Sequence, residues 1–186
     1  MKIKILSWNV RGLNIGERRQ RIKSNFQKWK ADIIVLQESK VDSAGRDIIK
    51  ELWASNFVDW TKLGARGTVG GILILWDSRM VSQLDEVRGN FSLSCLFKSL
   101  QDDFEWVLSG VYGPNDDAFR PSFWEELEEV NSRWDKPWCL SRDFNVVRFP
   151  NERKGYVHSS LAMNLFSELV DSNELIDPPT VGVWFT

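Results

Sequence analysis

The chain has 186 residues, a length typical of one domain, and its 42% hydrophobic and 27% charged residues are typical of soluble globular proteins. This balance excludes a disordered, collagen-like or coiled-coil chain, and no apolar run reaches the roughly 20 residues that span a bilayer. Because the net charge is −2, the chain as a whole has no attraction for nucleic acid, and any affinity for phosphate must be local.

The cysteines and the start of the chain bear on the cellular setting. Cys95 and Cys139 each stand alone inside an apolar stretch, which is typical of buried, reduced thiols. The chain turns polar at Ser7, so its first residues do not form the apolar segment of a signal peptide. These features predict an intracellular protein that does not enter a membrane.

The start of the chain predicts a strand, a helix and a second strand. Residues 2–10 show the alternation of a strand. Asn14, followed by Glu17, is typical of a capped helix start, and residues 17–30 have an amphipathic pattern. Residues 33–36 are apolar on both faces, as in a strand buried between two layers. This unit predicts a parallel strand pair joined by a right-handed crossover.

The rest of the chain predicts more strands and two more helices. Residues 72–76 have the pattern of a central strand, and the alternating residues 91–97 and 104–108 predict an antiparallel hairpin. Large apolar residues at helical spacing predict a helix over residues 119–134.

A short buried strand is expected over residues 138–140, followed by a last helix around residues 165–170 that is capped by Ser159 or Ser160. Residues 183–186 have the pattern of a further strand. Mixed sheets with helices outside them predict a layered α/β architecture.

Polar side chains interrupt the apolar strands where four of these strands end. The carboxyl ends of strands in layered α/β folds open into the ligand crevice. One pocket is therefore expected to hold five polar residues, namely Asn9, Glu38, Tyr112, Asp143 and Asn145. Each motif alone is more typical of a turn or a solvated loop, because Asp and Asn readily bond their own backbone. Their occurrence at four strand ends favours a common site.

This set of side chains has the chemistry of a metal-assisted phosphoesterase. Mg²⁺ takes one or two carboxylates and keeps several waters, and Glu38 is the best candidate ligand. Asn9 and Asn145 offer amide groups to the metal surroundings or to a phosphate. Asp143 is suited to orient or deprotonate a water, and Tyr112 to donate to a phosphate oxygen. An ion, an oriented water and phosphate donors together predict phosphodiester hydrolysis.

The same residues carry a family resemblance. Residues 7–13 (SWNVRGL), 34–38 (IVLQE), 110–115 (GVYGPN) and 143–145 (DFN) resemble successive motifs of the endonuclease/exonuclease/phosphatase superfamily. The chain is most similar to the amino-terminal endonuclease domains of plant LINE-type (non-LTR) retrotransposon polyproteins, over residues 2–186. The resemblance implies a DNase I-like four-layer α/β/β/α sandwich and Mg²⁺- or Mn²⁺-dependent nicking of target DNA, and so a nuclear location.

The resemblance also implies individual roles. Asn9 and Glu38 would match the metal-site pair, and Tyr112 the tyrosine on the phosphate side. Asn115 would match a substrate-contacting asparagine. The water-positioning and transition-state-stabilising pair would be matched by Asp143 and Asn145. From its place beside the proposed pocket, Arg148 is expected to bind substrate by steering phosphate, together with Arg153 and Lys154.

Two features depart from the family pattern. Ser141-Arg142 stands where members have glycine, and an arginine there is expected to displace Asp143 or to pair with it and lower its pKa. The single domain expected over residues 1–186 lacks the terminal Asp-His motif, and its sandwich would be incomplete at the C-terminus, with an unpaired sheet edge. The single histidine, His158, precedes a helix and is expected to be solvated or capping.

These departures leave alternatives open. A catalytically inactive remnant that binds nucleic acid or a protein is the main one. A second keeps the fold but acts on a phospholipid or an inositol phosphate. No residue pattern points to a particular protein partner or oligomeric state.

Overall fold

The computed structural model describes residues 2–40, 46–53, 55–65, 70–152 and 158–177, with Arg142 described by its backbone only. The elements run in the order β1 (Ile5–Asn9), α1 (Gly16–Trp29), β2 (Ile33–Gln37), α2 (Arg46–Trp53), β3 (Val58–Leu63), β4 (Ile72–Asp77), β5 (Val81–Arg88), β6 (Ser92–Ser99), β7 (Glu105–Tyr112), the 3-10 turn η1 (Asp117–Phe119), α3 (Arg120–Arg133), β8 (Trp138–Asp143), the 3-10 turn η2 (Pro150–Glu152) and α4 (Leu161–Ser172).

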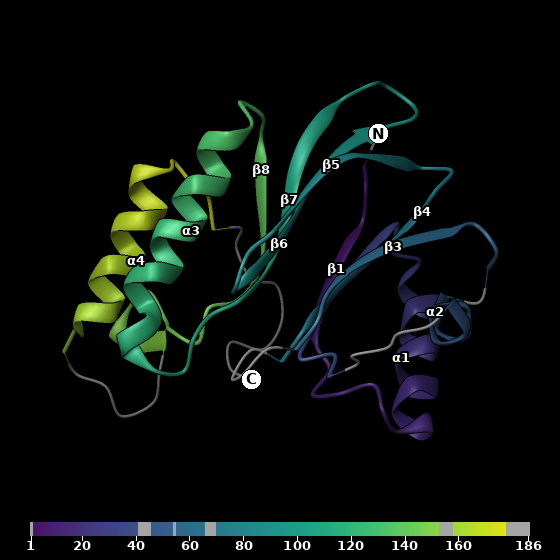
Figure 1. The fold of residues 1–186 in the computed structure, drawn as a ribbon, viewed down its shortest axis with the longest axis horizontal. Helices are drawn as coiled ribbons and strands as arrows, with labels where there is room; N and C mark the ends of the chain where they lie inside the picture. The colour runs from purple at the N-terminus through teal and green to yellow at the C-terminus, as the bar shows by residue number, and fades with distance from the viewer. Residues whose placement is uncertain (1, 41–45, 54, 66–69, 153–157, 178–186) are drawn as a thin grey trace.

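The described strands form two four-stranded mixed sheets, in the orders β1-β2-β4-β3 and β5-β6-β7-β8. One edge pair of each sheet is parallel, β1 with β2 and β7 with β8, and the other pairs are antiparallel. Helices α1 and α2 cover the first sheet, and α3 and α4 cover the second (Figure 1). The expected four-layer α/β/β/α sandwich is confirmed.

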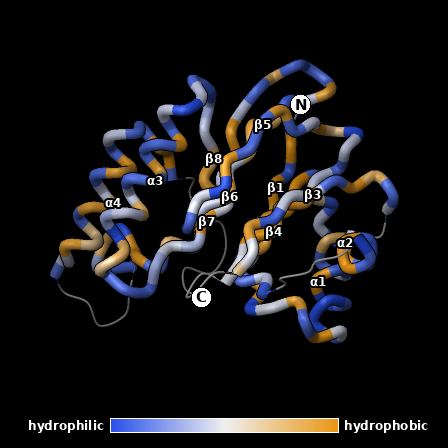
Figure 2. The backbone as a smooth tube through the Cα atoms, in the orientation of Figure 1, coloured by the Kyte–Doolittle hydropathy of each residue, from blue (hydrophilic) through white to orange (hydrophobic). Residues whose placement is uncertain are grey.

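The central strands are buried on both faces, as their composition predicts. In β2, Ile33 and Val35 face the second sheet, whereas Ile34 and Leu36 belong to the cluster under α1 and α2. Strand β4 divides its apolar side chains between the same two clusters. Figure 2 shows the hydrophobic colours gathered along the strands between the helical layers. A strand that is covered on both faces needs no polar alternation, which explains the continuous apolar runs.

Several further predictions are confirmed. The hairpin is β6–β7, the long helix is α3, and the strand predicted over residues 138–140 is the longer β8. Helix α4 begins after Ser160, whose hydroxyl accepts a hydrogen bond from the Met163 amide at 3.3 Å, and this selects Ser160 over Ser159 as the cap. Both cysteines are free thiols, and Cys95 is buried as predicted, whereas Cys139 is only partly buried. The strand expected at residues 183–186 lies outside the described residues.

One prediction at the start of α1 is wrong. Ile15, and not Asn14, occupies the cap position, and no side-chain cap bonds the first amides of the helix. Arg19 stabilises the first turn instead. Its amide donates to the Ile15 carbonyl at 3.1 Å, and its guanidinium donates to the Leu13 carbonyl at 2.9 Å.

One α-helix and two strands were not predicted: α2, β3 and β5. Strands β3 and β5 each lie at one edge of a described sheet, and many of their side chains are polar. Strand β5 also contains an irregularity between Gln83 and Asp85, which breaks the alternation that marks a strand. Edge strands with polar residues and bulges lack the apolar signal that reveals a buried strand. In the described part of the chain, no helix has the length and apolarity to cross a membrane.

The two sheets approach each other closely at Gly110 in β7. A Cβ atom at this position would lie 2.7 Å from Val35 Cγ1 and 2.9 Å from Ile72 Cγ2, both on the facing sheet. These distances are shorter than real Cβ contacts. Glycine at this position therefore allows the sheets to pack this closely.

We expect Gly110→Ala to lower the free energy of unfolding by about 1–3 kcal/mol, because the new methyl group overpacks the interior. Urea denaturation with fluorescence detection measures this change. Gly64→Ala is the matched control, since its Cβ would meet nothing within 4 Å. Equal stability of the two variants would contradict the proposed close contact between the sheets.

Candidate functional site

The strand register brings the predicted residues to one end of the sandwich. Asn9 is the register partner of Gln37 in the parallel pair β1–β2, and Tyr112 is the partner of Asp143 in the parallel pair β7–β8. Parallel strands end on the same side, so each pair delivers its polar ends together.

The two sheets are also joined at this end by the buried Gln37 side chain. Its amide nitrogen lies 2.9 Å from the Ser7 hydroxyl and 3.4 Å from the Ser141 carbonyl of β8, and Gln37 is 1% exposed. A buried amide of this kind must be satisfied, and here the bonds that satisfy it connect the first sheet to the second. The ends of β1 and β8 are thereby held in register with each other.

The Asn9 side chain connects the two carboxylates of the site. Its Nδ2 donates to Glu38 Oε1 at 2.8 Å and to Asp143 Oδ2 at 2.7 Å. Its Oδ1 accepts a hydrogen bond from the Arg11 amide at 3.2 Å, which agrees with this orientation of the amide. Four residues predicted to converge, Asn9, Glu38, Tyr112 and Asp143, therefore do so, although Asp143 lies 134 residues from Asn9 in the sequence.

Glu38 is held on several sides. Its Oε1 accepts a second hydrogen bond, from the Tyr112 hydroxyl at 3.1 Å, and its Oε2 lies 3.8 Å from Lys40 Nζ. The backbone of Glu38 is left-handed, with φ 50°, and Gly70 passes so close that a Cβ would lie 2.8 Å from Glu38 Cγ. Its side chain keeps an exposed fraction of 18%, so the carboxylate is anchored and still accessible.

Tyr112 is suited to remain a hydrogen-bond donor. It is 7% exposed, and burial, followed by the negative charge of Glu38 and the bond to it, raises the pKa of its phenol above the usual value of 10.0. Hydrogen bonds from the side chains of Asn115 and Asn145 oppose this shift. The hydroxyl is therefore protonated at neutral pH and lies among three of the predicted site residues.

The segment Asp143-Phe144-Asn145 forms a tight turn against the end of β7. The Gly113 amide donates to the Asp143 carbonyl at 2.7 Å, and Asn145 Nδ2 donates to the Gly113 carbonyl at 2.7 Å. Asn145 has a left-handed φ of 52°. A Cβ on Gly113 would lie 2.3 Å from the Phe144 carbonyl oxygen, so glycine is required for this contact. The turn places the Asn145 side chain beside Tyr112.

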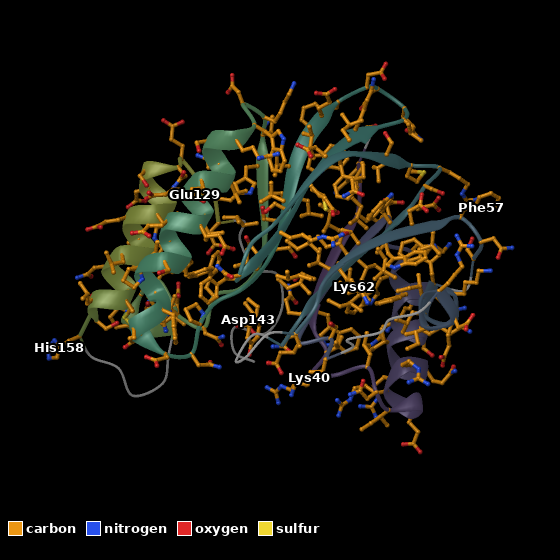
Figure 3. All side chains as sticks on the ribbon, in the orientation of Figure 1. Lys40, Phe57, Lys62, Glu129, Asp143 and His158 are labelled. Atoms are coloured by element: carbon orange, nitrogen blue, oxygen red, sulfur yellow. The ribbon has the colours of Figure 1, made fainter. Side chains whose placement is uncertain are left out.

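Arg148 and His158 make none of the contacts described above for the site residues. The Arg148 guanidinium is paired with Asp171 on α4 and lies over the Phe149 ring at 5.1 Å. His158 is exposed, as expected, and Figure 3 shows it well apart from Asp143. Arg153 and Lys154 lie outside the described residues.

The donor set fits a hard divalent cation. Glu38 and Asp143 supply two carboxylates around one amide, which is the number of carboxylates with which Mg²⁺ is usually bound alongside water. Among the described residues, no group of three His, Cys, Asp or Glu side chains is suited to hold a metal. The chemistry of the set therefore suits an ion that keeps most of its water.

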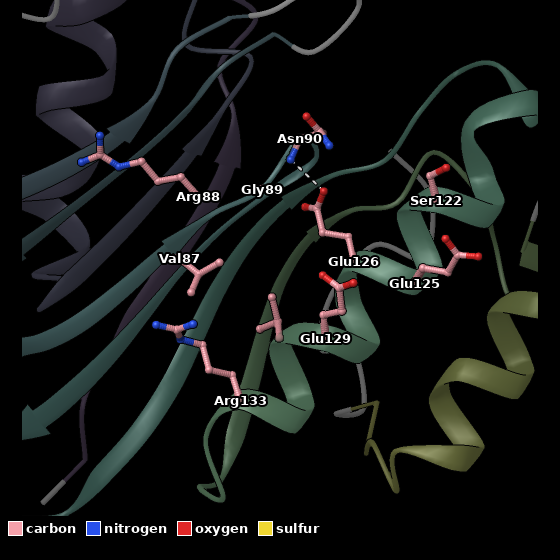
Figure 4. A pocket seen from close by; sticks show the side chains of 10 residues that line it. Val87, Arg88, Gly89, Asn90, Ser122, Glu125, Glu126, Glu129 and Arg133 are labelled. Atoms are coloured by element: carbon pink, nitrogen blue, oxygen red, sulfur yellow. Dashed lines mark hydrogen bonds between the residues drawn. The ribbon is translucent and has the colours of Figure 1, made fainter.

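A hollow of about 370 Å³ lies between the β5–β6 turn and α3 and shares no lining residue with this site. Its most buried acid, Glu126, already accepts hydrogen bonds from the Asn90 amide at 2.7 Å and the Ser92 hydroxyl at 2.6 Å. Figure 4 shows Glu126 directed at this turn. The carboxylate thus ties α3 to the second sheet.

Sequence patterns did not predict a role in the site for three residues that contact its members: Gln37, Lys40 and Gly70. Gln37 and Lys40 flank Glu38 closely in the sequence, and this proximity is the signal that could have identified them. Gly70 is distant in the sequence, and only its close approach to Glu38 reveals its role.

The chain was compared with protein-family models and with curated protein sequences. A family model described as endonuclease/exonuclease/phosphatase family matches residues 6–140, which include Asn9, Glu38, Tyr112 and Asn115. A search of curated protein sequences finds no match to the chain.

Solved structures share the fold at low identity. The endonuclease domain of TRAS1, a telomere-specific non-LTR retrotransposon, is similar with a TM-score of 0.66 and 16% identity, covering 92% of this chain and 72% of that one. The AP endonuclease of Leishmania major is similar with a TM-score of 0.66 and 16% identity, and the match covers 92% of this chain and 66% of that one. A mannosyl-6-phosphatase of Bacteroides thetaiotaomicron is similar with a TM-score of 0.64 and 15% identity, and the match covers 89% of this chain and 70% of that one.

The raised pKa of Tyr112 predicts a pH dependence of stability. The folded state holds the phenol proton more tightly than the unfolded chain, so this contribution is complete below about pH 10 and is lost as the pH rises through the raised pKa. We expect Tyr112→Phe to be less stable than the wild type by about 1 kcal/mol at pH 8, through loss of the bond to Glu38. The difference should shrink above pH 10. Urea midpoints of the two proteins, measured at pH 8 and above pH 10, check this. A stability difference between them that grows with pH would contradict it.

Proposed function

The chain belongs to the endonuclease/exonuclease/phosphatase family, and from this membership we propose that it is a metal-dependent phosphodiesterase that nicks DNA, an endonuclease of the LINE retrotransposon type. The observation that carries the proposal is the Asn9 amide, which joins Glu38 of the first sheet to Asp143 of the second. Two carboxylates that one amide holds together at the accessible end of a sandwich offer a divalent cation the oxygen ligands that it prefers.

Glu38 would bind Mg²⁺ or Mn²⁺, and Asn9 would orient this ligand through the bond that it already makes to Oε1. Such an ion supplies charge stabilisation on a phosphate and lowers the pKa of a bound water. Lys40 lies 3.8 Å from Glu38 Oε2 and would be free to move onto a phosphate once Glu38 is occupied by the ion.

The remaining side chains would act on water and phosphate. Asp143 is half-buried, and Asn9 holds its Oδ2, so the carboxylate is oriented to position a water and accept its proton. Tyr112, which stays protonated, would donate to a phosphate oxygen, and Asn145 beside it would stabilise the charge that develops in the transition state. Asn115 is exposed at the rim and would contact the substrate. Arg148 would steer phosphate after exchanging Asp171 for the DNA backbone.

DNA is the substrate that we propose, with a nuclear location as its corollary. The motif resemblance to plant LINE-type endonuclease domains supports this choice, and the fold shared with the TRAS1 endonuclease domain is consistent with it. The AP endonuclease and the sugar phosphatase have the same fold, so the fold alone leaves the phosphate ester open.

A second candidate is a protein of this fold that binds nucleic acid or a protein without cleaving phosphodiesters. Two observations favour it. Ser141, where family members have glycine, is 6% exposed, and its hydroxyl has no partner among the described residues. The described part of the chain also holds no third acidic or histidine side chain grouped with Glu38 and Asp143.

Nicking of supercoiled plasmid with Mg²⁺ or Mn²⁺, and with EDTA as the metal-free control, tests the proposal. We expect metal-dependent conversion to the open circle. Glu38→Gln and Asp143→Asn should each slow this conversion by about 10²–10⁴-fold, because each removes a carboxylate that acts on the ion or the water. Glu125→Gln, which neutralises an exposed acid on α3, is the matched control and should retain the wild-type rate.

DNA binding separates the two candidates. A chain that binds DNA, with an affinity that falls steeply as salt rises, but leaves the plasmid intact with either metal would support the non-cleaving protein and contradict the endonuclease. Equal nicking by the wild type and by both carboxylate variants would show that the cleavage comes from elsewhere.

A further inference from the structure

A buried arginine lies behind the candidate site. Arg120 is the first residue of α3, and its side chain is only 8% exposed. Arginine is rarely buried to this degree unless its charge is paired. The residues that follow it on the inner face of the helix, Phe123 and Trp124, are apolar core residues, so an apolar side chain at position 120 would also suit the helix.

The Arg120 guanidinium links two loops. Its Nε donates to Asp117 Oδ1 at 2.6 Å, and its Nη2 donates to the Asn145 carbonyl oxygen at 3.1 Å. Its Nη1 is buried and has no partner among the described residues. The Asp117 side chain is 83% exposed, so this ion pair is strongly screened by water and contributes little by itself. The bond to Asn145 is therefore the contact that distinguishes this arginine from a surface one.

Asn145 needs such a restraint. Its φ of 52° lies in the left-handed region, which an asparagine adopts more readily than most residues but which is still unfavourable. Its side chain donates to the Gly113 carbonyl at 2.7 Å and reaches the Tyr112 hydroxyl, so a rotation of its backbone would move the amide away from Tyr112. The bond from Arg120 fixes the carbonyl end of this residue and opposes that rotation.

We propose that Arg120 is a positioning residue, which orients the Asn145 side chain toward Tyr112 and the scissile phosphate by holding the Asn145 carbonyl. The inference rests on the proposed function, because it assigns Arg120 a part in the same reaction. Arg120 itself touches neither the metal ligands nor the expected phosphate position, and it acts through Asn145. A misplacement of about 1 Å in such a group can cost about 10²-fold in rate.

The experiment compares four variants of the protein. Arg120→Leu removes the guanidinium, and Arg120→Lys keeps the charge but loses the fork that bonds Asp117 and Asn145 together. Asp117→Asn weakens the ion pair and leaves the bond to Asn145 in place. Arg133→Leu is the matched control, since Arg133 lies on the same helix and pairs with Asp85 at 3.4 Å outside the site.

The first readout is nicking kinetics. We expect Arg120→Leu to lower kcat by about 10- to 100-fold with KM changed less than about threefold, because transition-state contacts are lost while DNA binding is not. Free guanidinium ion at millimolar concentration should restore part of this kcat. Arg120→Lys should be intermediate, and Asp117→Asn and Arg133→Leu should stay near the wild type. A rise in KM at constant kcat would overturn the inference.

The second readout does not need activity. ¹⁵N–¹H NMR signals of the Asn145 backbone and side-chain amides, identified by their loss in Asn145→Ala, should shift in Arg120→Leu and in Arg120→Lys but not in Arg133→Leu. Unchanged Asn145 signals in a folded Arg120→Lys would refute the positioning role. If the wild type fails to nick plasmid with either metal, the proposed function fails, and these NMR signals alone still decide whether Arg120 orients Asn145.

Discussion

The hydrogen bonds from one amide nitrogen hold this site together. Asn9 Nδ2 reaches a carboxylate on each sheet, Glu38 on the first and Asp143 on the second. Carboxylates brought this close repel each other, and the amide protons, with Lys40 beside Glu38, offset part of that repulsion. Two carboxylates joined by one amide are a donor set that suits a divalent cation. The chain belongs to the endonuclease/exonuclease/phosphatase family, whose name describes enzymes that act on phosphoesters.

The sandwich supplies the geometry that these bonds need. Each sheet has one parallel pair at its edge, and both pairs end on the same side of the molecule. Gly110 lets the sheets approach closely, and Gln37 bonds across to the Ser141 carbonyl where they end. The distance from Asn9 to Asp143 is thus set by core packing, because a wider spacing of the sheets would separate the two carboxylates.

Around the carboxylates, the structure arranges groups that donate hydrogen bonds. Tyr112 is kept protonated by burial and by Glu38, and Asn145 is held beside it in a left-handed conformation by Gly113 and Arg120. Hydrogen-bond donors that are already fixed around a developing negative charge stabilise it well, because they need little reorganisation during the reaction. The same arrangement would also bind an intact phosphate, which explains why the non-cleaving alternative uses the same residues.

Local patterns in the sequence were sufficient for the buried strands and for the strand ends at which Asn9, Tyr112 and Asp143 lie, because a strand covered on both faces is apolar throughout and a polar residue at its end is conspicuous. They were insufficient for the edge strand β5, whose polar residues and bulge break the alternation of a strand. They were also insufficient for the start of α1, where Ile15 replaces the expected cap Asn14 and the Arg19 guanidinium bonds the Leu13 carbonyl. Only the tertiary structure showed that Asn9 joins Glu38 to Asp143, that Arg148 is paired with Asp171 and that Arg120 holds Asn145. Each of these contacts joins residues far apart along the chain, and their distances depend on how the two sheets and their helices pack, which no local periodicity encodes.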